Sequence, residues 1–247
     1  MMLRLTLTIC TLALACQAMV HAAQAQSVSK RPLFAFYPPA CQQIEANAAS
    51  FPRQSTTKTT QYFTPLFPAG PDGGLRPEDR RNCLNIEGSC IVGRYLYNYN
   101  GTPNGARYEL DRVKFTFGKG SGGGSYNTTN ALFPCRTLAA ERRQYATGTV
   151  IFIPAFKNKI CPQNGQPMDG CFVVGDVGSA ITGRGRFDLF TGECAQYDGR
   201  TNVCRDPANP AFNVPIGTNF HVVSRDSPMA RSLRSELDAF VNNGWRP

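Results

Sequence analysis

Two aspartates stand in a stretch that is otherwise rich in glycine and apolar residues, residues 175–192 (GDVGSAITGRGRFDLFTG). Asp176 ends the apolar run CFVVGD, and Asp188 lies twelve positions later in RFDLF. If CFVVGD is a strand, the alternation of side chains places Asp176 on the face of Phe172 and Val174. Apolar neighbours disfavour the ionised carboxylate and raise its pKa, as a general acid near neutral pH requires. The pattern makes Asp176 a candidate catalytic acid.

Two simpler interpretations of this acid stay open. The Asp-Val-Gly sequence is also typical of a turn aspartate, and Arg184 or Arg186 offers a partner for a structural ion pair. In RFDLF, Asp188 points away from the face that Phe187 and Leu189 share. Spacing alone therefore does not establish a catalytic site.

A resemblance to a known family favours the catalytic interpretation. The stretch resembles the signature of the Asp-Asp-Asp (3D) domain, shared with membrane-bound lytic transglycosylase A, which runs roughly Asp-x-Gly-Gly-Ala-Ile-Lys-Gly and then Arg-x-Asp. The matching positions are Asp176, Gly178, Ala180, Ile181, Gly183, Arg186 and Asp188. Upstream, LAAE at 138–141 resembles the family's Leu-Ala-x-Asp, GT at 148–149 its Gly-Thr strand start, and TQYFT at 60–64 its Thr-x-Tyr-Thr. The four segments keep the family's order along the chain.

The sequence also departs from the family pattern. Glu141 replaces the first aspartate, Ser179 the second glycine and Thr182 the lysine, and Ala146 stands where the turn usually has proline. The missing lysine removes a cation from the signature, and Arg184 is the residue that could substitute for it.

The resemblance implies a double-psi β-barrel whose acidic cleft binds a peptidoglycan strand. It implies non-hydrolytic cleavage between N-acetylmuramic acid and N-acetylglucosamine, with a 1,6-anhydro product. Glycoside hydrolases need a second carboxylate to activate water or to attack the sugar. Here the C6 hydroxyl of the sugar attacks, so one carboxyl group can protonate the leaving oxygen and then act as base. The reaction requires no metal ion and no organic cofactor.

The position of each residue in the signature implies its role. Asp176 would be the general acid and base, while Asp188 and Glu141 would orient sugar hydroxyls, stabilise positive charge or raise the pKa of Asp176. Tyr62 is a candidate for stacking on a sugar face. The residues expected to bind the glycan are Thr60, Tyr62, Gly178, Ser179, Thr182, Arg184 and Arg186.

Other functions stay open as alternatives. A non-catalytic, expansin-like barrel could bind cell-wall glycan and keep an aspartate without cleaving it. A secreted, disulfide-rich interaction protein such as a toxin or an inhibitor is a third class. A nuclease is disfavoured because nothing surrounds His221 and Arg225 at motif spacing, and a serine hydrolase because Gly-x-Ser-x-Gly is lacking.

The N-terminus and the cysteines indicate an exported protein. Residues 1–25 combine a short basic start, an apolar run too short to span a bilayer and small-residue cleavage sites, which is typical of a secretory signal peptide. Cleavage would leave the protein in the periplasm or outside the cell; Cys16 fits a lipid-attachment pattern poorly. The eight remaining cysteines predict about four disulfides. Proximity and elimination give the pairs Cys83–Cys90, Cys161–Cys171, Cys194–Cys204 and Cys41–Cys135.

The formal net charge of +9 fits either colloidal solubility or attraction to a polyanion. The sequence has no arginine-rich helix or stacked-aromatic motif, so no nucleic-acid partner is predicted. It has no Cys-x-x-Cys, and His221 is the one histidine after the signal peptide, so no metal site is predicted. Nothing in the sequence indicates the oligomeric state.

We expect a mainly β chain in five segments. The signal peptide (1–25) precedes an N-terminal segment (26–65) with the first barrel strand at KTTQYF, which Thr64-Pro65 should end. An inserted β-rich subdomain or long loop (66–130) has candidate strands in IVGRYLYNY, ARYEL and RVKFTF and a flexible connector in GKGSGGGS. The double-psi barrel (131–225) has strands in GTVIFIPAF, CFVVGD, RFDLF and GTNFHVVS. A C-terminal helix and tail (226–247) begin at Asp226-Ser227-Pro228.

Overall fold

A computed structural model describes residues 38–121, 130–207 and 212–243 of the chain. The predicted signal peptide, Cys16 and the end of the glycine-rich connector lie outside these residues. Over the described ranges, no helix is both long enough and apolar enough to cross a membrane.

The chain is mainly β, as the sequence predicts. The strands are β1 (Arg53–Ser55), β2 (Lys58–Phe67), β3 (Ser89–Val92), β4 (Tyr95–Asn98), β5 (Ala106–Glu109), β6 (Thr137–Ala140), β7 (Val150–Phe152), β8 (Cys171–Asp176), β9 (Arg186–Cys194), β10 (Tyr197–Asp198), β11 (Val203–Cys204) and β12 (Asn219–Val223). The α-helices are α2 (Pro39–Ala46) and α3 (Pro228–Asn243). Short helical turns are η1 (Ala48–Ser50), η2 (Pro77–Asp79), the π-helical η3 (Arg81–Ile86), η4 (Leu110–Arg112) and η5 (Pro154–Phe156).

Ten strands form one mixed sheet in the order β1-β12-β7-β8-β6-β9-β2-β3-β4-β5. Only Thr56 and Thr57 separate β1, which pairs with β12, from β2, which pairs with β9. The backbone N–H of Thr56 donates to Thr218, and that of Thr57 to Gly185. One continuous segment therefore joins both ends of the order β12-β7-β8-β6-β9 and closes these strands into a ring. A double-psi connectivity for this ring remains a prediction.

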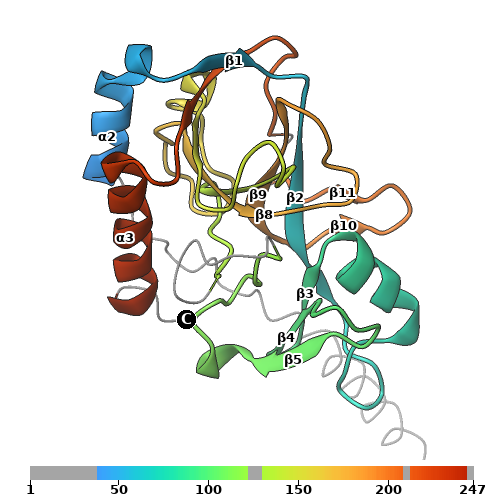
Figure 1. Cartoon of the computed structure of the whole chain (residues 1–247). Helices are drawn as coiled ribbons and strands as arrows, with labels where there is room; N and C mark the ends of the chain where they lie inside the picture. The colour runs from blue at the N-terminus through green and yellow to red at the C-terminus, as the bar shows by residue number, and fades with distance from the viewer. Residues whose placement is uncertain (1–37, 122–129, 208–211, 244–247) are drawn as a thin grey trace, which may run out of the picture. The chain divides into compact units, whose positions relative to one another are not determined.

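The inside of the ring is an apolar core that several ring strands fill. Side chains that alternate inward from β6, β7, β8, β9 and β12 pack together, and the largest of them are completely buried. The opposite faces of β7, β8 and β12 pack against α2 and α3. The two helices lie side by side (Figure 1).

The helix α3 begins where the sequence predicts. Pro228 is its first residue, and the Ser227 hydroxyl accepts a hydrogen bond from the Ala230 N–H at 3.1 Å, which caps the N-terminus. Leu233 and Leu237 of the predicted apolar stripe are buried in the core. The stripe is packing surface, as its spacing indicates.

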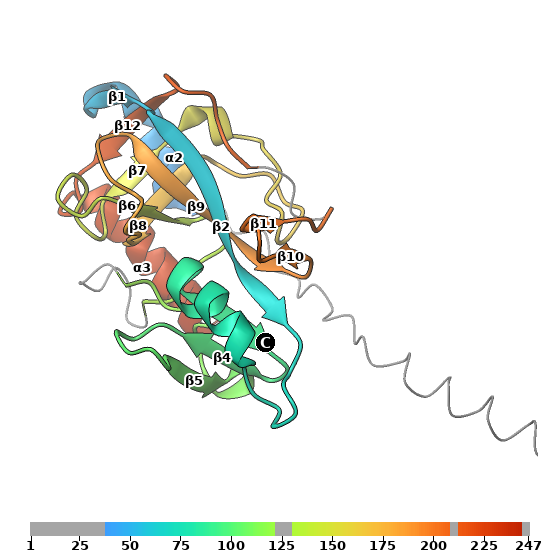
Figure 2. The ribbon, with the colours of Figure 1, turned by 90° about the vertical axis from the view of Figure 1, so that its right-hand side faces the viewer.

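The strand β2 is longer than the sequence predicts. It continues through Thr64-Pro65 to Phe67, with a shift in its pairing to β9 between Tyr62 and Thr64. Beyond this irregularity β2 pairs with β3, so a single strand runs from the ring into the β3–β5 hairpins (Figure 2). Pro65 lies opposite Cys194, directly after this irregularity, and bulges are among the places where sheets tolerate proline. RVKFTF, a predicted strand, instead forms part of η4 and irregular backbone.

The structure has four disulfides among the described residues: Cys41–Cys171, Cys83–Cys90, Cys135–Cys161 and Cys194–Cys204. The predicted pairs Cys161–Cys171 and Cys41–Cys135 are wrong. The reason is the antiparallel hairpin between these residues, in which Ile160 lies opposite Pro167 and Phe152 opposite Cys171. Cys161 lies near the tip of this hairpin and Cys171 at its base. The two cysteines are therefore too far apart along the hairpin to form a disulfide with each other.

Candidate active site

The pairing of four adjacent strands brings the predicted acids into one row. Thr60 on β2 is opposite Asp188 on β9, Asp188 is opposite Ala139 on β6, and Ala139 is opposite Asp176 on β8. Laterally paired residues point to the same face of a sheet. With strands about 4.8 Å apart, the two aspartate backbones are separated by roughly 10 Å across the small Ala139 side chain.

An irregularity in β8 turns Asp176 towards this face. Leu138 is opposite Val174 and the next residue, Ala139, is opposite Asp176, so Gly175 is an extra residue on β8. Val174 stays in the core inside the ring, whereas Ala139 faces outward. The expectation that Asp176 shares the face of Phe172 and Val174 is therefore wrong. Such bulges re-aim side chains next to functional sites, and this one places Asp176 on the face of Asp188.

The carboxyl group of Asp176 is held through one of its oxygens. Oδ1 accepts hydrogen bonds from the Ser121 N–H (2.8 Å), the Ser121 hydroxyl (2.9 Å) and the Val177 N–H (2.8 Å). Burial raises the pKa of Asp176, and these donors and the Tyr62 hydroxyl oppose that rise. Burial therefore prevails, and the carboxyl group retains its proton to higher pH than an exposed aspartate.

The residues Gly118–Ser121, called the strap here, cross over β8 and supply the two donors on Ser121. The Gly118 carbonyl accepts from the Leu132 N–H, and the Gly120 N–H donates to Asn130. A Cβ on Gly120 would lie 2.0 Å from the Gly175 carbonyl oxygen, so only glycine permits this crossing over β8. The first half of the predicted flexible connector is thus a packed part of the site.

The strap gives a direct prediction for Asp176. In Ser121→Ala the carboxylate loses a hydroxyl donor, so the pKa of Asp176 rises, and in Gly120→Ala the strap is displaced and the pKa rises further. Side-chain carboxyl NMR titration measures both changes. Ser232→Ala, which removes an exposed hydroxyl from α3, is the control and should leave the titration unchanged. An unaltered Asp176 titration in Gly120→Ala would show that the strap does not hold the acid.

The carboxyl group of Asp188 lies in a more charged environment. The Thr60 hydroxyl donates to its Oδ1 at 2.5 Å. Burial, with a further contribution from the charge of Asp176, raises the pKa of Asp188, while Thr60, Arg186 and Lys58 oppose the rise. The charge of Asp176 thus influences the ionisation of Asp188.

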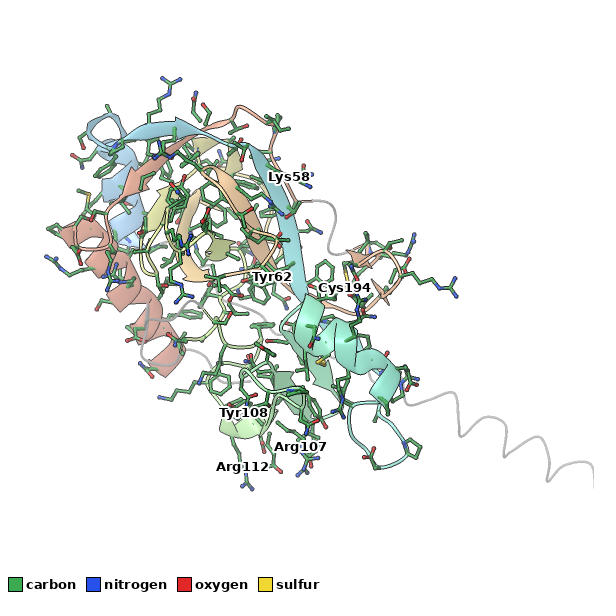
Figure 3. All side chains as sticks on the ribbon, turned by 45° about the vertical axis from the view of Figure 1, so that its right-hand side comes forward. Lys58, Tyr62, Arg107, Tyr108, Arg112 and Cys194 are labelled. Atoms are coloured by element: carbon green, nitrogen blue, oxygen red, sulfur yellow. A yellow bond between two sulfur atoms is a disulfide. The ribbon has the colours of Figure 1, made fainter. Side chains whose placement is uncertain are left out.

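Tyr62 lies on β2 between the ring and the β3–β5 strands, with Lys58 nearer the β1 end (Figure 3). Its ring packs on Phe190 with centroids 5.1 Å apart, and only 8% of the residue is exposed. The hydroxyl end faces Asp176. The ring is a buried wall of the site, and its hydroxyl is buried beside Asp176.

Glu141 is anchored to the loop between β8 and β9. It follows β6 directly, and its Oε2 accepts the Gly183 N–H at 2.5 Å. The structure thus places the first acid of the signature at the loop, while Asp176 and Asp188 meet on the sheet.

The same loop carries most of the predicted glycan-binding residues. Ser179, Thr182 and Arg184 are exposed on it, and Gly178 accepts a hydrogen bond from the Ile181 N–H. Arg186 begins β9 and donates to the Phe187 carbonyl at 2.6 Å. The loop is fixed at its end, because the Gly185 N–H donates to the Tyr145 hydroxyl at 3.0 Å.

Three residues near the acids have no counterpart in the sequence prediction: Ser121, Lys58 and Glu87. Ser121 was not predicted because it lies in a glycine- and serine-rich run that is typical of a linker. Lys58 was not predicted because nothing in the sequence distinguishes it from other surface lysines. The predictive signal for Ser121 is the Gly-x-Gly of the strap, which permits a close approach of two backbones.

The profile of the 3D domain family matches residues 136–203. Among solved structures, the chain is similar to E. coli MltA with bound chitohexaose (13% identity, 72% of this chain and 78% of that chain, TM-score 0.42). It is also similar to membrane-bound lytic murein transglycosylase from Agrobacterium tumefaciens (14%, 74% and 79%, 0.41) and to the lytic transglycosylase LtgG of Burkholderia pseudomallei (16%, 69% and 71%, 0.32). No curated protein matches the chain. The family match covers residues 136–203, which carry both aspartates of the row.

Proposed function

We propose that the protein is an exported lytic transglycosylase that cleaves peptidoglycan between N-acetylmuramic acid and N-acetylglucosamine. The observation that carries the proposal is the half-buried Asp176 carboxyl group on the same sheet face as Asp188, with the Ser121 N–H, the Ser121 hydroxyl and the Val177 N–H all donating to its Oδ1. The 3D domain match at these residues supports it.

The hydrogen bonds to Asp176 assign its two oxygens different roles. Oδ1 is the carbonyl-like acceptor of Ser121 and Val177, so the acidic proton resides on Oδ2. Oδ2–H protonates the glycosidic oxygen as the bond from C1 to that oxygen breaks. The carboxylate then accepts the proton of the C6 hydroxyl as its oxygen bonds to C1, which yields the 1,6-anhydro sugar and restores Asp176. Water is not consumed.

Asp188 and the loop serve the same reaction. Asp188, held by Thr60 and near Arg186 and Lys58, is placed to stabilise the positive charge that develops at C1. Ser179, Thr182 and Arg184 contact the glycan from the loop that Glu141 anchors. Export follows from the predicted signal peptide and places the enzyme in the periplasm or outside the cell.

The products distinguish the proposal from its alternatives. Protein lacking residues 1–25 should release 1,6-anhydro-muropeptides from isolated sacculi, detected by mass spectrometry. Products with ordinary reducing ends would indicate hydrolysis and contradict the proposal. Binding to sacculi or to chitohexaose without any product would favour the glycan-binding barrel. Heat-unfolded protein controls for carried-over lytic activity.

A further inference from the structure

A buried glutamate outside the 3D domain lies next to the acidic row. Glu87 follows η3 in the segment between β2 and β3 and is only 8% exposed. The mechanism above gives it no role. A carboxyl group that is removed from water requires hydrogen-bond partners or loses its charge, so its surroundings determine what it does.

The first partner of Glu87 is the irregular part of β2. Pairing between β2 and β9 shifts between Tyr62 and Thr64, which leaves the Phe63 N–H at the irregularity. Oε2 of Glu87 accepts this N–H at 3.3 Å. Glu87 therefore supports the backbone of β2 directly after Tyr62, whose hydroxyl faces Asp176.

The second partner is Tyr197 on β10. Its ring packs edge-on against Phe63 and Phe67, with centroids 5.7 and 5.6 Å away, and its hydroxyl is within hydrogen-bonding reach of Glu87. The same hydroxyl donates to Asn202 at 3.0 Å. A hydrogen bond from Tyr197 supports the ionised form of Glu87, and the burial of the carboxyl group outweighs it.

The charges around Glu87 also favour its neutral form. Burial first, and then the charge of Asp188, raise the pKa of Glu87 to about 8, against the opposing effects of the Phe63 N–H and Tyr197. Asp188 on β9 and Tyr197 on β10 are the titratable groups that act on it, and Arg81 and Asp198 act in turn on Tyr197. Over the described ranges of the chain, none of the groups that shift the pKa of Glu87 is a cation.

We propose that Glu87 is a further positioning residue of this site, which supports β2 beside Tyr62 and sets the amount of negative charge next to Asp188. Its consequence for catalysis rests on the proposed function. At neutral pH the Glu87 carboxyl group is uncharged and leaves Asp188 as the neighbouring anion. When Glu87 ionises, a second negative charge faces Asp188 and raises the affinity of the acid cluster for protons.

Carboxyl ¹³C NMR of the mature protein tests the coupling without reference to activity. Between about pH 4 and pH 9.5, we expect one glutamate resonance to titrate near pH 8 and to be absent from Glu87→Gln. The Asp188 resonance, assigned with Asp188→Asn, should show a step at the same pH that Glu87→Gln abolishes. Titration of Glu87 near 4.5, or an Asp188 resonance that ignores it, would overturn the proposal. The wild-type titration alone suffices if the variant fails to fold.

Thermal unfolding gives a second readout. The folded protein holds the Glu87 proton up to about pH 8, whereas an unfolded glutamate releases it near 4.5, so the folded state binds more protons between these values. The resulting stabilisation is complete below pH 4.5 and is lost as pH rises through 8. The Tm advantage of wild type over Glu87→Gln should decline across this window, and a constant difference would contradict a neutral Glu87.

The activity assay on sacculi tests the effect of the Glu87 charge, because a glutamine oxygen can still accept the Phe63 N–H. The rate of product release by Glu87→Gln should equal that of wild type near neutral pH. At pH 9 it should exceed the wild-type rate by about threefold or more, because the variant places no second negative charge next to Asp188. The exposed Glu78→Gln is the matched control and should keep the wild-type profile. Identical profiles for wild type and Glu87→Gln would overturn the role. If wild type releases no product at any pH, the proposed function fails, and the NMR titration still decides the proposal about Glu87.

Discussion

Replacing Asp176 with asparagine is expected to reduce the release of 1,6-anhydro-muropeptides by roughly 10²–10⁴-fold, the usual contribution of a general acid. The amide oxygen can accept the same hydrogen bonds from Ser121 and Val177. The substitution therefore removes the transferable proton and keeps the local structure. Mass spectrometry of sacculus digests measures the rate.

Stability separates loss of chemistry from loss of fold in this variant. Because burial raises the pKa of Asp176, an amide that never ionises should leave the Tm unchanged or raise it. Asp111→Asn, at an exposed position in η4, is the matched control and should keep full activity. Release within a factor of about ten of wild type by Asp176→Asn would remove it from the role of general acid.

The second large effect concerns stability. Replacing Cys41 and Cys171 together by alanine should lower the free energy of unfolding by about 5 kcal/mol, because their bond closes a loop with a sequence separation of 130. The same change at Cys83 and Cys90, with a separation of 7, should cost about 2 kcal/mol. Chemical denaturation of the two double variants measures the difference.

The comparison between the two variants is internally controlled, because both replace two buried half-cystines by alanine. Their difference therefore reports the loop length and not the lost side-chain volume. Equal losses would show that the Cys41–Cys171 bond does not act by restricting the unfolded chain. Each variant should retain the remaining three disulfides, which intact-mass measurement verifies.

Part of the fold was predictable because buried strands have apolar, β-branched sequences that can be recognised. CFVVGD is β8 to the residue, and the cap signal at Ser227-Pro228 gives the start of α3. The four-residue β6 overlaps the family motif but was not predicted as a strand, since TLAA has no β-branched apolar residue. The observed cysteine pairs depend on the length and direction of the hairpin between β7 and β8, which local sequence does not encode.

The acidic residues of the site could be predicted from the sequence, whereas the residues that position them could not. Strict alternation would put Asp176 inside the ring, and the extra residue Gly175 reverses this. Ser121 lies 55 positions from Asp176 in a run that reads as a linker. In the sequence Glu87 resembles an ordinary surface residue, but in the structure it is buried next to β2 and β10. Each of these contacts is made between distant segments, where sequence patterns carry no information.

The ring closes with both ends of the described chain, and this sets the order in which the protein can mature. Thr59 on β2 donates to the Val214 carbonyl, 155 positions later, so a ribosome or an export channel must release the chain as far as β12 before the ring can form. During that delay Cys161 and Cys171 are close neighbours in a nascent, unfolded chain. Oxidation that outpaces closure would join them and leave Cys41 and Cys135 without their native mates. We therefore expect native pairing to require reshuffling by a disulfide isomerase, or an oxidant that acts more slowly than the ring closes.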